Sequence, residues 1–396
     1  MKRILIIGAG FLQSFVIKKA KKMGYETFTV DFNPESVGFQ YADHYKVIDI
    51  VDKEACLKYA KKNNIDGVLT AATDYGVLTT SYIAQEMRLP GLNYDVAKLV
   101  KNKYQVRKRL FCPNNYCTEQ VYEINQYTNL NELGQTLTFP VIVKPCDGSG
   151  SRGVQKIESF ESFAKICFHA MKASITHTVM IEPFIFGKEY GAESIVLNGD
   201  IHVLGVMRKW MTASSYHAEL GHAIPTDLPT HIEEQIKDSV KNVIKLLGIN
   251  FGSVNMDIIV TPENKIHIID VGARMGGNMI GPCIIPYGTG IDYMSVLIRS
   301  AMGDDVDLKS FNRGVVVTRL LTFHQGVVVN LPDFKALEDE YAVEIYHQLS
   351  IGQIVNEYRT NLDGCGYIIS RDKDIENAIK KADVVLSIIR NIIFND

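Results

Sequence analysis

Two aspartates stand on either side of a short turn, in a pattern that suits metal binding. Asp257 and Asp270 belong to two β-rich runs separated by the four residues Pro262–Lys265. If these runs form antiparallel strands with Thr261 facing Ile266, the two aspartates face each other. Directly opposed like charges are destabilising, unless a divalent cation that prefers oxygen ligands lies between them. The turn therefore predicts a Mg²⁺ site, whereas a register shifted by one residue would place the carboxylates on opposite faces of the sheet.

Two lysines occupy positions that require an anion. Lys103 falls on the apolar stripe of a basic helix expected over residues 94–111, and Lys144 ends the strand-like run that begins at Pro140. A charged side chain held against apolar surface needs a compensating charge. The phosphates of ATP would supply that charge to both lysines.

A glycine- and serine-rich segment follows Lys144 and precedes another short β-rich run. Glycine and serine let backbone amides approach phosphate oxygens. Because no G-K-[ST] sequence and no immediate helix follow, we expect a strand–loop–strand flap rather than a P-loop. An ordinary flexible hairpin is the alternative. The residues expected to meet phosphate are Gly148, Ser149, Gly150, Ser151 and Gly153.

Four further polar side chains are candidates, each with a structural alternative. Arg274 lies in a glycine-rich segment after Asp270, and a guanidinium suits phosphate or carboxylate; it could equally be a surface arginine in a turn. Arg208 and Lys209 end a β-rich run and are candidates for the same contacts, or form an exposed basic strand end. His222 is either a substrate contact or proton acceptor, or a structural histidine in a turn.

The first glycine pair of the chain lies between a strand-like run and a helix-like run. Gly8 and Gly10, with Asp31 at the end of the next strand-like run, match part of the dinucleotide-binding fingerprint. The third glycine position is Gln13, so the fingerprint is incomplete. NAD binding and a tight strand-to-helix turn both remain open at this point.

Composition narrows the class of protein. The chain has 396 residues, of which 46% are hydrophobic and 22% charged, and a net charge of -3. This charge gives no reason to expect nucleic acid or an anionic membrane as a partner. The seven cysteines contain no C-x-x-C pair, which argues against a zinc site or a disulfide framework and favours a reducing cytoplasm. No run of 18 apolar residues predicts a membrane span.

The hydrophobic patterns that must position these side chains change along the chain. Strand and helix patterns alternate over about the first 95 residues, which predicts a parallel sheet. Beyond residue 113 the pattern becomes α+β, with helices near 160–171 and 232–247. From about Gly314, short strands and a helix over 374–392 predict an appended α+β unit.

Taken in this order, the motifs resemble those of the ATP-grasp superfamily over roughly residues 1–310. The resemblance implies that Lys103 and Lys144 contact nucleotide phosphates beneath the flap. It also implies that Asp257 and Asp270 hold the metal ions and that Arg274 is the catalytic arginine.

The same resemblance implies contacts to the adenosine part of a nucleotide. Glu182 and the backbone at Phe184 would meet adenine, and Glu189 would hold the ribose hydroxyls. One departure concerns the metal: where the superfamily commonly reads E-x-N-P-R, this chain has Gly272 at the asparagine position. Asn255, predicted opposite Gly272, is our hypothesis for the missing metal ligand.

The resemblance implies an α/β and α+β multidomain fold, in which a Rossmann-like domain precedes an ATP-grasp lid and core. The expected boundaries are 1–95 for the Rossmann-like domain, 96–112 for a linker helix, 113–187 for the lid, 188–310 for the core with the metal site, and 311–396 for a small α+β subdomain.

The activity implied is that of a cytoplasmic ligase that uses ATP and Mg²⁺, or Mn²⁺, to join a carboxylate to an amine through an acylphosphate, with Arg274, Lys144 and Arg208 as catalytic residues. The run 219–225 and the tail beyond residue 314 look like those of amino-acid and dipeptide ligases, with kinship to biotin carboxylase and carbamoyl phosphate synthase. Small-molecule substrates, a homodimer and no nucleic-acid or membrane partner are expected. The alternatives are a phosphoribosylglycinamide synthetase-like or carbamoyl-phosphate-synthase-like ligase, a non-catalytic nucleotide sensor and an NAD(P)-binding protein.

Overall fold

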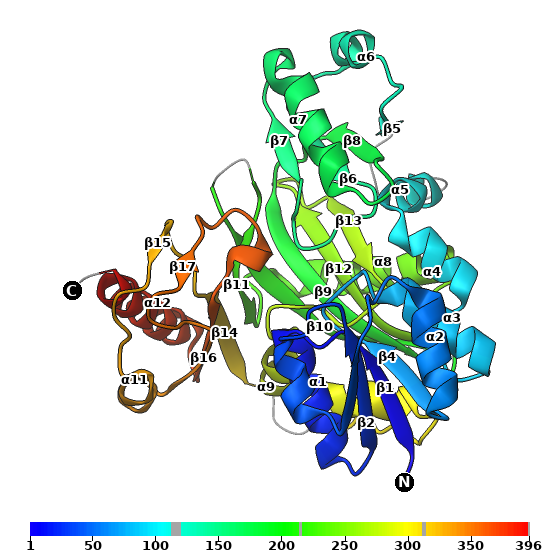
Figure 1. The fold of residues 1–396 in the computed structure, drawn as a ribbon. Helices are drawn as coiled ribbons and strands as arrows, with labels where there is room; N and C mark the ends of the chain where they lie inside the picture. The colour runs from blue at the N-terminus through cyan, green and yellow to red at the C-terminus, as the bar shows by residue number, and fades with distance from the viewer. Residues whose placement is uncertain (112–119, 214–215, 311–313, 395–396) are drawn as a thin grey trace.

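The computed structural model describes residues 1–111, 120–213, 216–310 and 314–394. Three sheets of four, eight and four strands organise these residues, together with a two-stranded sheet. The eight-stranded sheet lies between the other two, and the small sheet with β6, β7 and β8 projects at one end of the molecule (Figure 1). None of the helices in the described ranges combines the length and the apolar character needed to cross a membrane.

The N-terminal domain contains the parallel sheet that the alternating patterns predict. Its strand order is β3-β2-β1-β4, and all three pairings are parallel. Ile4 to Ile7 of the central strand are fully buried, as expected for a parallel sheet covered on both faces. The elements are β1 Arg3–Ile7, α1 Phe11–Lys22, β2 Glu26–Asp31, β3 His44–Val47, α2 Lys53–Lys62, β4 Gly67–Thr70 and α3 Val77–Met87.

The single helix expected over residues 94–111 is wrong. The structure has two helices, α4 Tyr94–Lys101 and α5 Lys103–Phe111, separated by Asn102. Asn102 is extended, with φ -104° and ψ 105°, and therefore breaks the helical path. As a result Lys103 begins a new helix instead of extending the apolar stripe of α4.

The small antiparallel sheet has the order β5-β8-β6-β7 and is covered by α7. Its apolar side chains pack with those of α6 and α7 into a core of their own. The segment between β6 and β7 is a strand–loop–strand flap, as predicted. The elements are β5 Tyr122–Ile124, α6 Leu130–Thr136, β6 Val141–Pro145, β7 Gln155–Ile157, α7 Phe160–Ala173 and β8 Val179–Pro183.

The eight-stranded sheet has the order β13-β12-β9-β10-β11-β14-β18-β16. The apolar face of α8 packs on β9, β10 and β12. The elements of this half are β9 Lys188–Leu197, β10 Asp200–Met211, β11 Glu219–Ile224, α8 Thr230–Leu247, β12 Gly252–Val260, β13 Ile266–Gly272, α9 Ile285–Thr289 and α10 Tyr293–Ala301.

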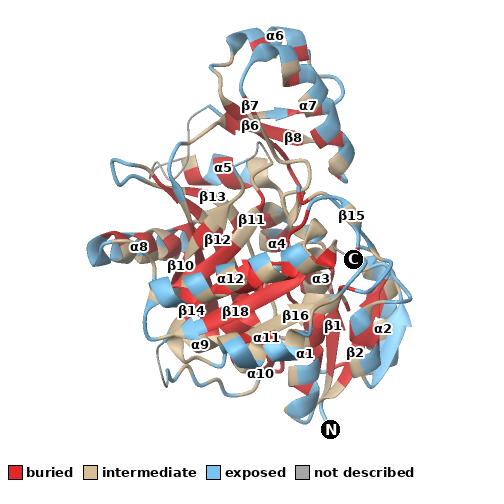
Figure 2. Ribbon diagram, turned by 90° about the vertical axis from the view of Figure 1, so that its left-hand side faces the viewer, coloured by how far each residue is buried: buried red, intermediate tan, exposed pale blue. Residues whose placement is uncertain are grey.

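The strands of the C-terminal segment continue the eight-stranded sheet through the pairing of β11 with β14, while its apolar side chains pack largely into a core of their own. Buried residues run along β14 and β18, where α12 packs (Figure 2). The expected domain boundaries themselves stay predictions. The elements are β14 Val315–Leu320, β15 Gly326–Val327, α11 Phe334–Tyr341, β16 Val343–His347, β17 Ile354–Val355, β18 Gly366–Asp372 and α12 Ile375–Ile393.

The hairpin of β12 and β13 has the aspartate pairing that the turn predicts, although by a different route. Asp257 pairs with Asp270. At the turn, however, Val260 rather than Thr261 pairs with Ile266, so the expected register is wrong by one residue there. A β-bulge at Ile269 restores the predicted register before the aspartates are reached, because it inserts one unpaired residue into β13.

Candidate functional site

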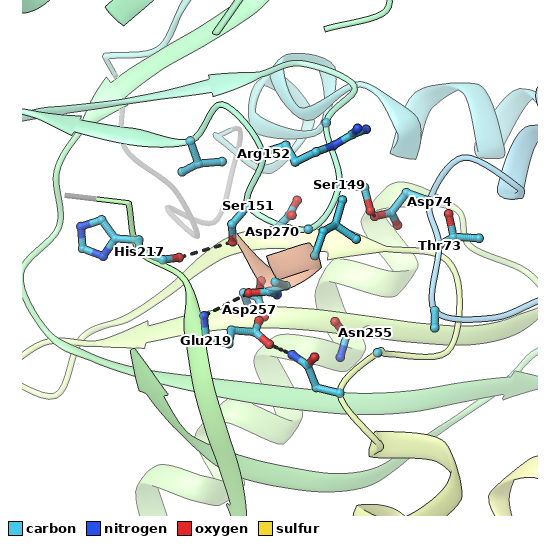
Figure 3. Close-up of a pocket in the computed structure, with 18 of the residues that line it drawn as sticks. Thr73, Asp74, Ser149, Ser151, Arg152, His217, Glu219, Asn255, Asp257 and Asp270 are labelled. Atoms are coloured by element: carbon cyan, nitrogen blue, oxygen red, sulfur yellow. Dashed lines mark hydrogen bonds between the residues drawn. The ribbon is translucent and has the colours of Figure 1, made fainter. Parts of the chain in front are cut away.

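A cavity of about 630 Å³ lies where the N-terminal domain, the flap, the eight-stranded sheet and the C-terminal segment meet. Figure 3 shows Asp257, Asp270 and Glu219 facing the flap residues Ser149 and Ser151. Most of the predicted site residues line it: Lys103, Lys144, Gly148, Ser149, Gly150, Ser151, Glu182, Phe184, Glu189, Asn255, Asp257, Asp270 and Arg274.

Lys209 lies at the centre of an acidic group in this cavity. Its Nζ is 2.7 Å from Asp257 Oδ1, 2.7 Å from Glu219 Oε1 and 3.9 Å from Glu189 Oε2. We call these four residues the Lys209 cluster. Three carboxylates therefore share one ammonium group, and the Lys209 side chain is only 2% exposed.

The three carboxylates of the cluster titrate differently. Burial raises the pKa of Glu219, but Lys209 brings it down to about 2. Burial raises the pKa of Glu189 to about 7; Lys209 opposes this shift, and Asp257 and Glu219 reinforce it. Burial also raises the pKa of Asp257, with Glu219 and Asp270 adding to the shift against Lys209. A cation placed beside Glu189 and Asp257 would lower both pKa values.

A second group of charges lies where α5 meets strands β6 and β8 of the small sheet, at the edge of the cavity. It consists of Glu182, Arg107 and Lys144, and we call it the Glu182 cluster. Glu182 accepts hydrogen bonds from Arg107 Nε at 2.7 Å and from Lys144 Nζ at 2.8 Å. Although burial raises the pKa of Glu182, the two cations bring it down to about 2. This carboxylate is thus fully compensated by protein cations.

The bulge in β13 joins this cluster to the aspartate pair. Because Ile269 is outside the strand ladder, its carbonyl oxygen accepts hydrogen bonds from Arg107 and, at 3.3 Å, from Lys144. Asp270, the next residue, forms an ion pair with Lys103. The bulge therefore sets both the register of Asp270 and the position of two cations.

Lys103 and Lys144 each have a carboxylate of the protein as a partner, Asp270 and Glu182 respectively. The protein itself therefore supplies the compensating charge that was expected from the phosphates of ATP. They still line the cavity, so contact with a phosphate stays a prediction.

The flap is closed over the cavity by contacts with two other parts of the chain. Ser149 Oγ donates to Asp74 at 2.8 Å, and Ser151 Oγ donates to the carbonyl oxygen of His217 at 3.3 Å. Arg152 donates to the hydroxyl of Tyr75. Sequence reasoning missed these partners because no local pattern marks them.

Gly153, unlike the other predicted flap residues, is not among the described residues that line the cavity. Its φ is +70°, and a Cβ there would lie 2.8 Å from Ala173 Cβ and 2.9 Å from Pro145 Cγ. This glycine permits the flap to pack on α7. Its predicted phosphate contact is not supported by this position.

Arg274 is held between the N-terminal domain and the sheet. Its Nε is 2.9 Å from Asp74 Oδ1, and its Nη1 donates a hydrogen bond to Asn255 Oδ1 at 3.3 Å. Asn255 lies opposite Gly272, as predicted, and its Nδ2 donates to the fully buried Glu193 at 2.9 Å. The role of Asn255 as a metal ligand stays a prediction, and the same oxygen already serves Arg274.

Arg208 requires a correction. It is absent from the described residues that line the cavity, whereas its neighbour Lys209 is present. Successive side chains of a strand point to opposite faces, and Arg208 instead lies over the ring of Trp210, 4.7 Å from its centroid. Arg208 is therefore outside the site, and Lys209 is the cation that β10 contributes.

His222 lines the cavity and is 1% exposed. Burial lowers its pKa to about 4, although Glu219, whose Oε2 is 3.6 Å from Nε2, opposes this shift. The imidazole is therefore neutral at neutral pH, and its Nδ1 has no hydrogen-bond partner among the described residues.

The glycine pair at the start of α1 also lines the cavity. Asp31 accepts a hydrogen bond from the backbone of Ala9 at 2.8 Å, and Gln13 donates to the carbonyl oxygen of Ala71 at 2.6 Å. Asp31 thus stabilises the turn itself, and Gln13 ties the start of α1 to the residue after β4. These contacts favour the strand-to-helix turn over the dinucleotide interpretation.

The aspartate pair fits a magnesium ion. Among the described residues no group of three or more histidine, cysteine or acidic side chains could hold a metal ion by itself. Mg²⁺, however, is usually bound through one or two carboxylates together with substrate phosphates and water. Asp257 and Asp270, opposed on neighbouring strands at the acid-rich end of the cavity, match that donor set.

Comparison with known proteins defines the class of fold. Residues 137–282 match the family model described as an ATP-grasp domain. The chain therefore carries an ATP-grasp domain, and both the recognised superfamily and the expected fold class are confirmed.

The more particular relatives span several ligases. The carbamoyl phosphate synthase large chain of Clostridium perfringens is 21% identical over 96% of this chain, and the chain spans only 37% of that relative's length. The structure is similar to phosphoribosylglycinamide synthetase from Anaerococcus prevotii (25% identity, 100% of both chains, TM-score 0.76). It is also similar to L-amino acid ligase from Bacillus licheniformis (19% identity, 100% of this chain and 99% of the other, TM-score 0.84).

Proposed function

We propose that this protein is an ATP- and Mg²⁺-dependent ligase that joins a carboxylate to an amine and releases ADP and phosphate. One observation carries the proposal: the opposed Asp257 and Asp270 share a cavity with Lys103, Lys144, Arg274 and a flap rich in glycine and serine. Carboxylates for a metal and cations for phosphates are the two requirements of phosphoryl transfer.

The protein's own contribution is electrostatic. Lys103 and Lys144 neutralise nucleotide phosphates under the flap, and Arg274 stabilises charge on the transferring phosphoryl group. Asp257 and Asp270 hold Mg²⁺, which supplies Lewis-acid stabilisation of the phosphates when bound. The activated carboxylate is an acylphosphate, which the amine attacks to form an amide with loss of phosphate.

The part of the cavity next to the Glu182 cluster suits adenosine. Phe184 and Ile185 line the cavity next to Glu182, and Glu189 is within reach of the same space. Both oxygens of Glu182 accept from Arg107 and Lys144, and the Phe184 N–H donates to the carbonyl oxygen of Pro140 at 3.0 Å. We therefore assign adenine recognition to the other backbone groups of Phe184 and Ile185. Glu189 remains the candidate for the ribose hydroxyls.

Amino-acid-like substrates are the favoured class, because the structure matches L-amino acid ligase over its whole length with a TM-score of 0.84. A ligase similar to phosphoribosylglycinamide synthetase is the second candidate, favoured by the 25% identity over both whole chains. A nucleotide sensor without turnover is the alternative from another class. Catalysis by a homodimer in the cytoplasm completes the proposal.

The test is ATP-dependent release of ADP and phosphate across pairs of amino acids and small amines, with Mg²⁺ present. Asp270→Ala is the blank, and Asp238→Asn, whose side chain is 73% exposed on α8, is the matched control for loss of an aspartate. Release that requires both a carboxylate and an amine, is kept by the control and is lost in Asp270→Ala supports the ligase.

Other outcomes separate the alternatives. Release that depends on glycine with phosphoribosylamine, and on no amino-acid pair, identifies the second candidate. Binding of ATP without release under any pair supports a sensor. Absence of ATP binding in equilibrium dialysis contradicts the proposal altogether.

A further inference from the structure

Asp74, a residue of the N-terminal domain, contacts two groups that belong to different parts of the cavity. It lies in the loop between β4 and α3. Its Oδ1 is 2.9 Å from Arg274 Nε, and its Oδ2 accepts from the Arg274 guanidinium at 3.1 Å and from Ser149 Oγ at 2.8 Å. One carboxylate thus joins Arg274 to the flap, and Figure 3 shows Ser149 and Asp74 side by side at the cavity edge.

This carboxylate is charged and firmly placed. Its side chain is 16% exposed, as is that of Arg274. Burial raises the pKa of Asp74, but Arg274, Lys101 and Lys103 lower it below its ordinary value. Of the two contacts with the Arg274 guanidinium, the one from Nη2 to Oδ2 is a hydrogen bond, whereas Nε is close to Oδ1 but has no hydrogen-bond partner among the described residues. The ion pair and this single hydrogen bond together orient the guanidinium.

Among the described residues, the printed hydrogen bond on the opposite side of Arg274 comes from the sheet. Asn255 Oδ1 accepts from Arg274 at 3.3 Å, and Asn255 is in turn fixed by Glu193. These partners come from the rigid strands β9 and β12. Among the described contacts of Arg274, only Asp74 is therefore shared with the flap.

The next residue of the same loop also contacts the flap. The Tyr75 hydroxyl accepts from Arg152, whose guanidinium lies 5.2 Å from the centroid of the Tyr75 ring. Two consecutive residues of the N-terminal domain therefore meet two residues of the flap. The loop 73–75 lies where it can respond to whether the flap is closed.

We propose that Asp74 is a positioning residue that couples closure of the flap to the orientation of Arg274. With the flap closed, the Ser149 hydroxyl bonds Oδ2 and keeps the carboxylate in the orientation that pairs with Arg274. With the flap open, the carboxylate loses this bond and holds Arg274 less firmly. The inference rests on the proposed function, because that function assigns Arg274 to the transferring phosphoryl group.

Three variants separate the two contacts of Asp74. Ser149→Ala removes only the hydrogen bond between Asp74 and the flap, and Asp74→Ala removes both this bond and the ion pair with Arg274. Asp74→Asn keeps the size of the side chain and an oxygen for Ser149 but removes the charge opposite Arg274. Asp43→Asn is the matched control, because Asp43 also forms a partly buried hydrogen bond and a lysine ion pair in the N-terminal domain but is not among the described residues that line the cavity.

The first measurement is amide hydrogen exchange of residues 148–153 in the full chain without nucleotide. Asp74→Ala and Ser149→Ala are expected to accelerate exchange of the flap to the same extent. Exchange of the sheet and helices of the N-terminal domain should not change. Asp43→Asn should leave flap exchange as in the parent. Equal flap exchange in Asp74→Ala and the parent would overturn the proposal without reference to activity.

The second measurement is the kcat and the KM for ATP of each variant. We expect about a 10- to 100-fold loss of kcat in Asp74→Ala and Asp74→Asn, with a change of less than about threefold in KM, because the lost interaction acts on the transition state. Ser149→Ala should lower kcat in the parent and have no further effect in the Asp74→Ala background. Multiplicative effects would instead show that Ser149 and Asp74 act independently and would overturn the coupling.

The two proposals fail in different ways. Absence of turnover in the parent contradicts the proposed function and with it the catalytic half of this inference. Turnover in the parent with unchanged kcat in Asp74→Asn and Asp74→Ala contradicts only the positioning role.

Discussion

The Glu182 cluster and the Lys209 cluster lie in the same cavity but have opposite charge balances. In the Glu182 cluster one carboxylate meets two cations, and the pKa of Glu182 falls to about 2. In the Lys209 cluster three carboxylates meet one cation: the pKa of Glu219, 2.7 Å from Lys209, falls to about 2, whereas the pKa of Glu189, 3.9 Å from it, rises to about 7. The first group is complete within the protein, whereas the second has negative charge that a bound cation would balance.

The difference separates a carboxylate that the protein's own cations compensate from carboxylates that a bound cation would balance. Burying charges is unfavourable unless they are paired, so a compensated cluster stabilises the fold once it is formed. An uncompensated acidic cluster costs stability, and such cost is common where a protein binds a charged ligand. We therefore expect loss of Glu182 to change stability and loss of a carboxylate of the Lys209 cluster to change activity. Loss of Lys144 should change both, because the proposed function also assigns this lysine to nucleotide phosphates.

The largest effect is expected from Glu182→Gln, which removes the counter-charge of Arg107 and Lys144. Breaking a buried ion pair from one side costs about 3–5 kcal/mol, so the free energy of unfolding in urea should fall by that amount. Glu234→Gln, on the exposed face of α8, should change it by less than about 0.5 kcal/mol. A Glu182→Gln variant as stable as the parent would remove the distinction between the two clusters.

Asp257→Asn is expected to lower kcat by about 10²- to 10³-fold, the loss typical of removing one group that stabilises the transition state. Its unfolding free energy should not fall, because burial and the neighbouring acids already raise the pKa of this carboxyl. Initial rates of ADP release and urea unfolding of the same preparation give both values. Destabilisation by several kcal/mol would place Asp257 with the structural ion pairs.

The free energy of unfolding should depend on pH differently in the parent and in Glu189→Gln. Its pKa is raised from 4.5 to about 7, so the folded state binds this proton more tightly than the unfolded state does. The resulting stability is fully present below about pH 4.5 and is lost as pH rises through about 7. Relative to Glu189→Gln, the parent should lose up to about 3 kcal/mol over this window. Parallel pH profiles of unfolding for the two proteins would refute the raised pKa.

The smallest expected effect is stabilisation by Mg²⁺ alone. At ten times its dissociation constant, an ion that binds only the folded state adds about 1.4 kcal/mol. Thermal unfolding at pH 8 should show this gain in the parent and less of it in Asp257→Asn, with EDTA as the reference. An equal gain in both proteins would mean that Mg²⁺ binds elsewhere.

Local patterns were sufficient for most of the elements. The helices expected over 160–171, 232–247 and 374–392 occur as α7, α8 and α12, because their apolar spacing is long and regular. The helix expected over 94–111 was wrong because a single extended residue, Asn102, interrupts a stripe that otherwise continues. Periodicity does not report such a break.

Long-range contacts were beyond local patterns. The pairing of Asp257 with Asp270 could be predicted because both lie near one turn, although the bulge at Ile269 that produces it could not. Asp74 and Glu193 carry no motif, and they became visible only through Arg274 and Asn255, which lie far from them in the chain. Arg208 and Lys209 are adjacent in a strand, so only the direction of the pleat decides which one enters the cavity.

The sequence by itself determined the kinds of residue available for a nucleotide site: opposed aspartates, buried lysines, a glycine-rich flap and an arginine after the second aspartate. It also determined the α/β and α+β fold class through its hydrophobic periods. The tertiary structure decided which of these charges are already compensated and which are not, as in the Glu182 and Lys209 clusters. The reason is physical: the pKa of a buried carboxyl depends on the charges within a few ångströms of it, and those charges come from strands and loops that only the folded chain brings together.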